Sequence, residues 1–255
     1  MNHAKRTLQY LQWAIYSLSG LVCAFFLSWI ILASVDFAYP VLHELLDITE
    51  HTERFGPQNR YRDDFELTNQ AERERLFSEI VTAIHNDGKG LDSLVYHDAN
   101  TGESIATLLH RAEIIHLTDV AILINVLYWV ALIAAILWVT FVFLFAKQTF
   151  PIPTFKQQIT ATLILVTACT ILVLIIGPVK VFYAFHDWIF PANHQWFFYY
   201  QESLMTILMK APYLFGYIAI LLLALTLPLF TVAQLTAYKW VLGYNASQPA
   251  QAEPN

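Results

Sequence analysis

Four long apolar runs, each able to cross a lipid bilayer as a helix, constrain this chain more than any other feature. They extend over residues 11–34, 120–145, 159–181 and 214–238. A hydrocarbon core of about 30 Å needs about 20 apolar residues in a helix. Because 57% of the 255 residues are hydrophobic and only 13% are charged, one water-soluble core could not bury the apolar surface. The sequence therefore predicts a mainly α-helical, polytopic membrane protein with four transmembrane helices.

The positions of Lys and Arg predict the orientation, since short cytoplasmic segments retain positive charge. Lys5 and Arg6 precede the first run, Lys147 and Lys156 lie between the second and third, and Lys239 follows the fourth. We therefore expect both termini in the cytoplasm and the two longer loops outside the cytoplasmic (inner) membrane. The first run is longer than the roughly 7–15 apolar residues of a signal peptide, so we interpret it as an uncleaved signal anchor.

These expectations divide the chain into five segments. They are the N-terminal tail and first transmembrane helix (1–34), an extracytoplasmic cap (35–119), the second and third transmembrane helices (120–181), an aromatic-rich outer loop (182–213), and the fourth transmembrane helix with a cytoplasmic tail (214–255). The cap is too long to be a structureless connection, because such loops beyond about 15 residues are uncommon in compact proteins. The tail from Ser247 is rich in Pro, Ala and Gln, and we expect it to be disordered.

Local patterns predict some structure inside the cap. Asn69 and Glu72 form a capping pair, after which apolar residues follow at helical spacing, namely Leu76, Phe77, Ile80, Val81 and Ile84. Gly88 and Gly90 are expected to end this helix. We then expect an extended piece over residues 91–96, a turn at 100–102, and a helix from Thr107 that continues into the second transmembrane run.

Charge and cysteine usage exclude several functions. Between Asp36 and Asp119 lie 17 of the 20 acidic residues, and the sequence has no Lys/Arg cluster that could neutralise several phosphates, so a nucleic-acid partner is not expected. Cys23 and Cys169 both fall in apolar runs, where a thiol acts as a small hydrophobic group. They suggest no disulfide or nucleophile.

Two polar clusters lie at the outer ends of the second and third runs. Arg111 begins the string RAEIIHLTDV, in which Glu113, His116 and Asp119 are three residues apart and share one face of a helix. His186 and Asp187 follow the third run, after a Gly177–Pro178 pair expected to bend or end that helix. Because the two runs form a hairpin, the two histidines are expected at the same membrane depth on adjacent helices. Ionisable groups there are costly unless they are paired or functional.

The second outer loop is unusually aromatic. Between Phe182 and Phe215, 12 of 34 residues are aromatic, most densely at Trp188, Phe190, Trp196, Phe197, Phe198, Tyr199 and Tyr200. Interfacial belts explain part of this density. The remainder could line a site that grips acyl chains and excludes water. The other histidines are interpreted as ordinary surface or loop residues, namely His43, His51, His85, His97, His110 and His194.

These motifs together resemble the lipoprotein intramolecular transacylase family. The likeness rests on RAEIIHLTDV entering the second run, on FHDWIFP after the third, and on the following Trp196 and Phe197. The resemblance implies a membrane enzyme that moves an acyl chain of a diacylated lipoprotein from the sn-2 oxygen of the glyceryl group to the amine of the N-terminal cysteine. It implies that His116 and His186 are catalytic. Its substrates would be lipoproteins and its surroundings membrane lipids, without a metal or other cofactor.

The residues themselves suggest supporting roles. Glu113, Asp119 and Asp187 are candidates to orient the imidazoles, Arg111 supports the same cluster, and Trp188, Phe190, Trp196 and Phe197 are candidates for substrate binding. Acyl transfer within one molecule needs no acyl-enzyme, which agrees with the lack of an obvious Ser or Cys nucleophile.

Three alternatives remain open at this stage. Glu113, His116 and His186 could bind zinc in an intramembrane hydrolase, although the H-E-x-x-H signature is missing. The two histidines could instead bind b-type haem in a protein without enzymatic activity. The chain could also be an assembly subunit whose cap binds a partner, and the sequence does not indicate an oligomeric state.

Overall fold

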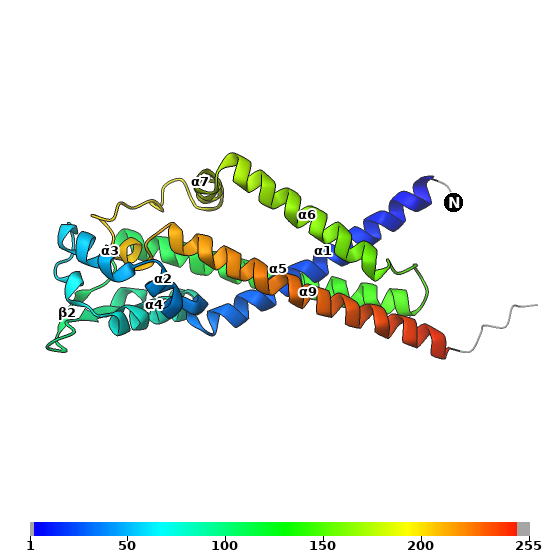
Figure 1. Ribbon diagram of the computed structural model, residues 1–255, viewed down its shortest axis with the longest axis horizontal. Helices are drawn as coiled ribbons and strands as arrows, with labels where there is room; N and C mark the ends of the chain where they lie inside the picture. Colours follow the sequence, from blue (N-terminus) through cyan, green and yellow to red (C-terminus); the bar gives the residue numbers. More distant parts are fainter. Residues whose placement is uncertain (1–2, 249–255) are drawn as a thin grey trace, which may run out of the picture. The chain divides into compact units, whose positions relative to one another are not determined.

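The computed structural model describes residues 3–248, and within that range four helices are long and apolar enough to span a membrane (Figure 1). These spans are Lys5–Ala33, Arg111–Ala146, Phe155–Ile176 and Tyr213–Ser247, so the predicted mainly helical membrane fold is confirmed. The tail from Ser247 was expected to be disordered, and its residues beyond 248 lie outside the described residues.

The elements follow one another mostly as helices. The α-helices are α1 (His3–Ala33), α2 (Tyr39–Leu45), α3 (Ile48–Phe55), α4 (Gln70–Ile84), α5 (Arg111–Ala146), α6 (Phe155–Ile176), α7 (Pro178–Ile189), α8 (Leu204–Met209) and α9 (Tyr213–Ser247). Short 3-10 turns are η1 (Asp36–Ala38), η2 (Gly56–Gln58), η3 (Phe65–Leu67) and η4 (Leu91–Ser93). Two strands, β1 (Val95–His97) and β2 (Ser104–Thr107), form an antiparallel pair.

The chain divides into two compact units. The first contains the described residues 3–29, 128–172 and 222–248, which are parts of the four long helices and the connection between α5 and α6. In its buried cluster, Tyr16 of α1 packs edge-on against Phe145 of α5, with the ring centroids 5.1 Å apart. In the same unit, the hydroxyl of Thr226 in α9 donates to that of Ser28 in α1 over 3.1 Å. Packing with such interhelical hydrogen bonds is how helices associate within lipid.

The second unit contains residues 30–127 and 173–221, and therefore both polar clusters identified in the sequence. Its core includes Tyr39, whose ring stacks on Phe77 of α4 with centroids 4.1 Å apart and whose hydroxyl donates to the carbonyl of Leu208 in α8. The helix predicted from residue 69 is confirmed, since the side chain of Asn69 accepts the backbone N–H of Glu72 and α4 begins at Gln70. This unit holds the candidate site.

The expectation of a helix from Thr107 is wrong. Residues Ser104–Thr107 form β2, which pairs with β1 in the register Val95↔Thr107, Tyr96↔Ala106 and His97↔Ser104, with a bulge after Tyr96. The helix begins four residues later, at Arg111, and from there it continues without a break into the membrane span as predicted. The hairpin therefore ends just before the polar string that opens α5.

The third span also ends earlier than residue 181. α6 stops at Ile176 because Gly177 has φ +99° and ψ 125°, a backbone conformation that side chains with a Cβ rarely adopt. Pro178 then begins α7, where its missing N–H removes no helical hydrogen bond. The predicted break at Gly177 and Pro178 is confirmed, and it separates His186 on α7 from the membrane span itself.

Candidate active site

The start of α5 is fixed by its own side chains. The backbone N–H of His110 donates to Oε2 of Glu113 over 2.7 Å, and Nδ1 of His110 accepts the backbone N–H of Ala112 over 3.2 Å. This reciprocal arrangement is a capping box with a histidine at the first position. It sets where the helix begins, and hence which face of α5 carries the polar residues that follow.

Glu113 also binds the far end of the outer loop. Its Oε1 accepts the hydroxyl of Ser203 over 2.5 Å and the backbone N–H of Met205 over 3.1 Å. The residue is 0% exposed, so its carboxylate is buried and held by three donors. We expected Glu113 to orient a catalytic imidazole, but these contacts identify it as the residue that holds α8 and the loop end against α5.

The two histidines named from the sequence lie close together. The imidazole centroids of His116 on α5 and His186 on α7 are 6.2 Å apart, and the rings are inclined by 33°. His116 is buried and His186 is partly exposed. At this separation, nitrogens of both rings can reach one small polar group placed between them.

The tautomer of His186 follows from its hydrogen bond. Its Nδ1 lies 2.7 Å from the carbonyl oxygen of Phe182, one helical turn earlier, and a carbonyl can only accept. Nδ1 therefore carries the proton, and Nε2 keeps a lone pair. Burial lowers the pKa of His186 below its usual value, although the bond to Phe182 and the nearby carboxylate of Asp187 act in the opposite direction. The neutral imidazole is thus favoured near neutral pH.

Aromatic side chains surround both imidazoles. Phe190 lies against both rings, with centroids 4.9 Å from His116 and 5.3 Å from His186. The ring of Trp196 is 4.9 Å from that of His186, and the ring of Phe198 is 6.2 Å from that of His116. The residues after α7 therefore fold back over the pair and shield it with apolar surface.

The four predicted substrate-binding aromatics occupy different surroundings. Phe190 and Trp196 touch the imidazoles, whereas Phe197 packs edge-on against Tyr183 of α7 with centroids 5.7 Å apart. Trp188 is 82% exposed, so its side chain faces the surroundings of the protein. Phe198, which belonged to the dense aromatic stretch but was not singled out, is buried next to His116.

The remaining polar candidates also lie in different surroundings. Oδ2 of Asp119 lies 2.7 Å from Nδ1 of His194, a histidine interpreted from sequence as an ordinary loop residue. Asp187 acts on its neighbour His186 through its charge. Arg111 is exposed at the first position of α5. Sequence spacing indicated that Glu113, His116 and Asp119 share a face, but it could not indicate which distant residues they meet.

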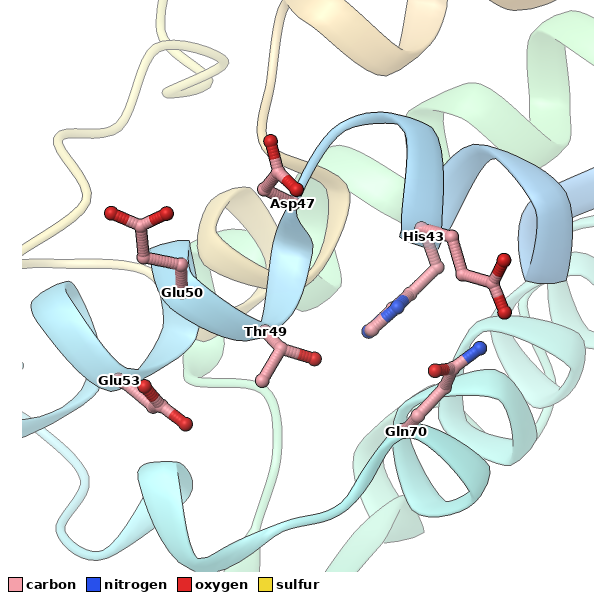
Figure 2. Close-up of a pocket in the computed structure, with 7 residues that line it drawn as sticks. His43, Asp47, Thr49, Glu50, Glu53 and Gln70 are labelled. Atoms are coloured by element: carbon pink, nitrogen blue, oxygen red, sulfur yellow. The ribbon is translucent and has the colours of Figure 1, made fainter.

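No group of three or more His, Cys, Asp or Glu among residues 3–248 is arranged to hold a metal ion. A separate acidic hollow of about 390 Å³ lies in the cap, lined by His43, Glu44, Asp47, Thr49, Glu50, Glu53 and Gln70 (Figure 2). Its lining shares no residue with the two-histidine cluster. Four carboxylates at its rim could attract cations, but Arg73 occupies the adjoining core and bonds to both His43 and Thr49.

Comparisons with known proteins agree with the motif analysis. The family described as "Lipoprotein intramolecular transacylase Lit" matches residues 94–214, a range that contains both histidines and the aromatic loop. No curated protein matches the chain. The resemblance that the sequence motifs indicated is confirmed by this match to the family.

Solved structures of the membrane-integral lipoprotein intramolecular transacylase Lit from Bacillus cereus are similar to this chain. A variant with a histidine-to-arginine substitution aligns with a TM-score of 0.65 and 16% identity, covering 96% of this chain and 97% of that one. A second structure of the Bacillus cereus protein aligns with a TM-score of 0.62 and 15% identity, covering 95% and 99%. At this identity the structural likeness establishes the fold.

Proposed function

Taking the resemblance to the lipoprotein intramolecular transacylases as the premise, we propose that this chain transfers an acyl chain within a diacylated lipoprotein. The acyl group would leave the sn-2 oxygen of the glyceryl group and bond to the amine of the N-terminal cysteine, which gives the lyso form of the lipoprotein. The observation that carries the proposal is the pair of imidazoles, His116 and His186, with centroids 6.2 Å apart inside an aromatic enclosure.

The reaction is balanced within one substrate molecule. The amine nitrogen forms a bond to the ester carbonyl carbon and loses a proton, while the bond between that carbon and the glyceryl oxygen breaks and the oxygen gains a proton. The intermediate is an eight-membered ring, which is entropically unfavourable to close. Holding the reacting ends together can lower such a barrier by roughly 7–11 kcal/mol. Shaping the substrate is therefore as important as proton transfer.

The hydrogen bond of His186 supports a role for this residue as the base. With Nδ1–H donated to Phe182, only Nε2 can accept the proton of the attacking amine and return it to the departing oxygen. Burial supports this role because it lowers the pKa of His186 and keeps the ring neutral. His116 would then donate a hydrogen bond to the oxyanion that develops on the former carbonyl oxygen, since an imidazole ring carries at least one N–H.

The aromatic enclosure complements the substrate. Phe190, Trp196 and Phe198 bring apolar surface to the imidazoles, which suits an acyl chain and reduces the access of water. Exclusion of water is required because hydrolysis of the ester competes with transfer. Trp188, which is 82% exposed, is proposed to contact the acyl region or headgroups of the surrounding lipid.

We place the reaction on the outer side of the cytoplasmic membrane. Each span has one end that, by the order of the hairpins along the chain, is remote from the two histidines. The basic residues that flank these ends are Lys5, Arg6, Lys147, Lys156 and Lys239. Under the positive-inside rule these ends face the cytoplasm, so both termini are cytoplasmic and the cap is extracytoplasmic.

The test is conversion of a synthetic diacylated lipopeptide by the purified protein. Because transfer is an isomerisation, the intact mass stays constant, and tandem mass spectrometry must locate the acyl chain on the cysteine nitrogen. We expect conversion by the unmodified protein and none by His116→Ala or His186→Ala. His85→Ala is the matched control, since Nδ1 of His85 makes the same type of bond, to the carbonyl of Val81 over 2.7 Å, outside the candidate site.

Two further variants test the separate roles. His116→Gln retains an N–H donor and should keep measurable activity. His186→Gln cannot accept and return a proton, so its rate of acyl transfer should fall by at least about 100-fold. No conversion by the unmodified protein would reject the function. Loss of a fatty acid from the product would indicate a hydrolase, sensitivity of the activity to a chelator would indicate a metal, and a Soret band would indicate haem.

A further inference from the structure

The segment that covers the two imidazoles has no secondary structure to hold it in place. Residues 190–203, between α7 and α8, contain neither helix nor strand, yet they carry Phe190, Trp196 and Phe198. Ordering such a segment costs conformational entropy at every residue. Interactions with a neighbouring element must therefore determine where these three aromatic side chains lie.

Two acidic residues of α5 supply interactions with this segment. At the far end, the buried carboxylate of Glu113 binds the hydroxyl of Ser203 and the backbone N–H of Met205. Six residues later on α5, Asp119 binds Nδ1 of His194 over 2.7 Å. Because residues three apart lie on one side of a helix, His116 stands between these two attachment points.

His194 is well placed to control the middle of the segment. Its backbone N–H donates to the carbonyl of Pro191 over 2.9 Å, which closes a turn directly after Phe190. Two residues beyond His194 comes Trp196, whose ring lies 4.9 Å from that of His186. An attachment at His194 therefore restrains the aromatic residues on both sides of it.

The chemistry of the contact suits a clamp. A carboxylate only accepts hydrogen bonds, so Nδ1 of His194 carries the proton and donates it to Asp119. The side chain of Asp119 is only 13% exposed and that of His194 is 34% exposed, so the contact is partly shielded from water. Hydrogen bonds to an ionised partner are stronger than neutral ones, and shielding strengthens them further.

We propose that the contact between Asp119 and His194 is a clamp that holds residues 190–203 over the two-histidine centre, and that His194 is a positioning residue for acyl transfer. This inference rests on the proposed function for its catalytic part. Its structural part, the fixing of the segment by the clamp, is independent of which reaction the site performs.

The experiment combines turnover with hydrogen exchange of the full-length protein in detergent micelles. His194→Ala and Asp119→Ala should each increase amide exchange in peptides covering residues 191–200 and leave α4 unchanged. With the diacylated lipopeptide, we expect kcat to fall by about 100-fold, the scale expected for a misplacement of about 1 Å, while KM changes less. The double variant should be no worse than either single variant, because both remove the same contact.

A conservative variant separates positioning from general damage. His194→Asn places an amide N–H donor where Nδ1 now lies, so it should keep the protection of residues 191–200 and most of kcat, whereas His194→Ala should not. Unchanged exchange in both alanine variants overturns the clamp. Increased exchange with unchanged kcat overturns the positioning role. If the unmodified protein converts no substrate, the proposed function fails, and the exchange result still decides whether the clamp exists.

Discussion

The carboxylate of Glu113 accepts a hydrogen bond from the hydroxyl of Ser203, 90 residues further along the chain, over 2.5 Å. The same carboxylate accepts two backbone N–H groups, from His110 and Met205, and it is fully buried. One side chain thus caps α5 and fastens the start of α8 to it.

We predict that Glu113→Gln destabilises the protein more than Ser203→Ala does. The amide nitrogen of glutamine would face an N–H or O–H donor where the carboxylate now accepts, and a buried hydrogen bond to a charged group contributes about 1.5–3 kcal/mol. Ser203→Ala removes one bond to Glu113 and the cap of α8, at about 1–2 kcal/mol. Thermal unfolding in detergent measures both. Glu103→Gln, at an exposed position in the β1–β2 hairpin, is the control. The prediction is contradicted if Glu113→Gln has the same unfolding midpoint as Glu103→Gln.

A second prediction concerns pH and the cap. Nε2 of His43 accepts a hydrogen bond from Nε of Arg73 over 3.0 Å, so the imidazole is held neutral. Burial, and then the charge of Arg73, lowers the pKa of His43 to about 4. The unfolded chain has the ordinary value of about 6.5 and binds the proton first as pH falls. The contribution of His43 to stability is therefore complete above pH 6.5 and is lost progressively towards pH 4.

This prediction is checked by unfolding the protein at a series of pH values. Each unit of pKa difference corresponds to about 1.4 kcal/mol, so the loss attributable to His43 should reach roughly 2–3 kcal/mol near pH 4. His43→Gln should reduce the slope of stability against pH between 6.5 and 4, although it lowers stability at neutral pH. The pKa of His51 is also lowered to about 4, by burial and by two nearby cations. His51 therefore adds a second dependence of stability on pH with the same sign. Equal slopes in His43→Gln and the unmodified protein would refute the assignment.

The sequence predicts well those features that depend on neighbouring residues. The four spans follow from apolar composition over 20 or more residues, and α4 follows from Asn69, Glu72 and helical spacing. The meeting of His116 and His186 follows from hairpin topology, because His116 lies near the start of one span and His186 lies beyond the end of the next. None of these inferences requires knowledge of a distant partner.

Features that depend on distant partners could not be predicted. β1 and β2 have three and four residues, too few for an alternating pattern, and their pairing depends on each other across a turn. The spacing of Glu113 and Asp119 placed both on the correct face, but only the folded chain brings Ser203 to one and His194 to the other. His194 in particular has no local signal, since a histidine after Pro191 is ordinary in a loop.

A third prediction concerns the break between α6 and α7. Gly177→Ala should be strained because of its φ of +99°, at about 1–3 kcal/mol, even though no atom lies within 4 Å of the added Cβ. The strain acts on the segment that sets the direction of α7, so the position of His186 should change. We expect a decrease in acyl transfer without loss of membrane insertion. Gly216→Ala, which also meets no atom but has ordinary helical geometry, should leave transfer unchanged. Equal activity of the two variants would show that the break does not position His186.

The last prediction concerns packing inside the membrane. A Cβ added at Gly20 of α1 would lie 2.5 Å from Nε2 of Gln234 on α9 and 2.8 Å from the indole of Trp138 on α5, so the glycine lets three helices approach one another. Gly20→Ala should overpack this region and lower stability by about 1–3 kcal/mol. Gly243→Ala is the matched control, because that Cβ meets no atom within 4 Å. Gln234→Ala combined with Gly20→Ala should recover part of the loss, since the shortened side chain vacates the space. If Gly20→Ala unfolds at the same temperature as Gly243→Ala, the close approach of the helices at this glycine does not contribute to stability.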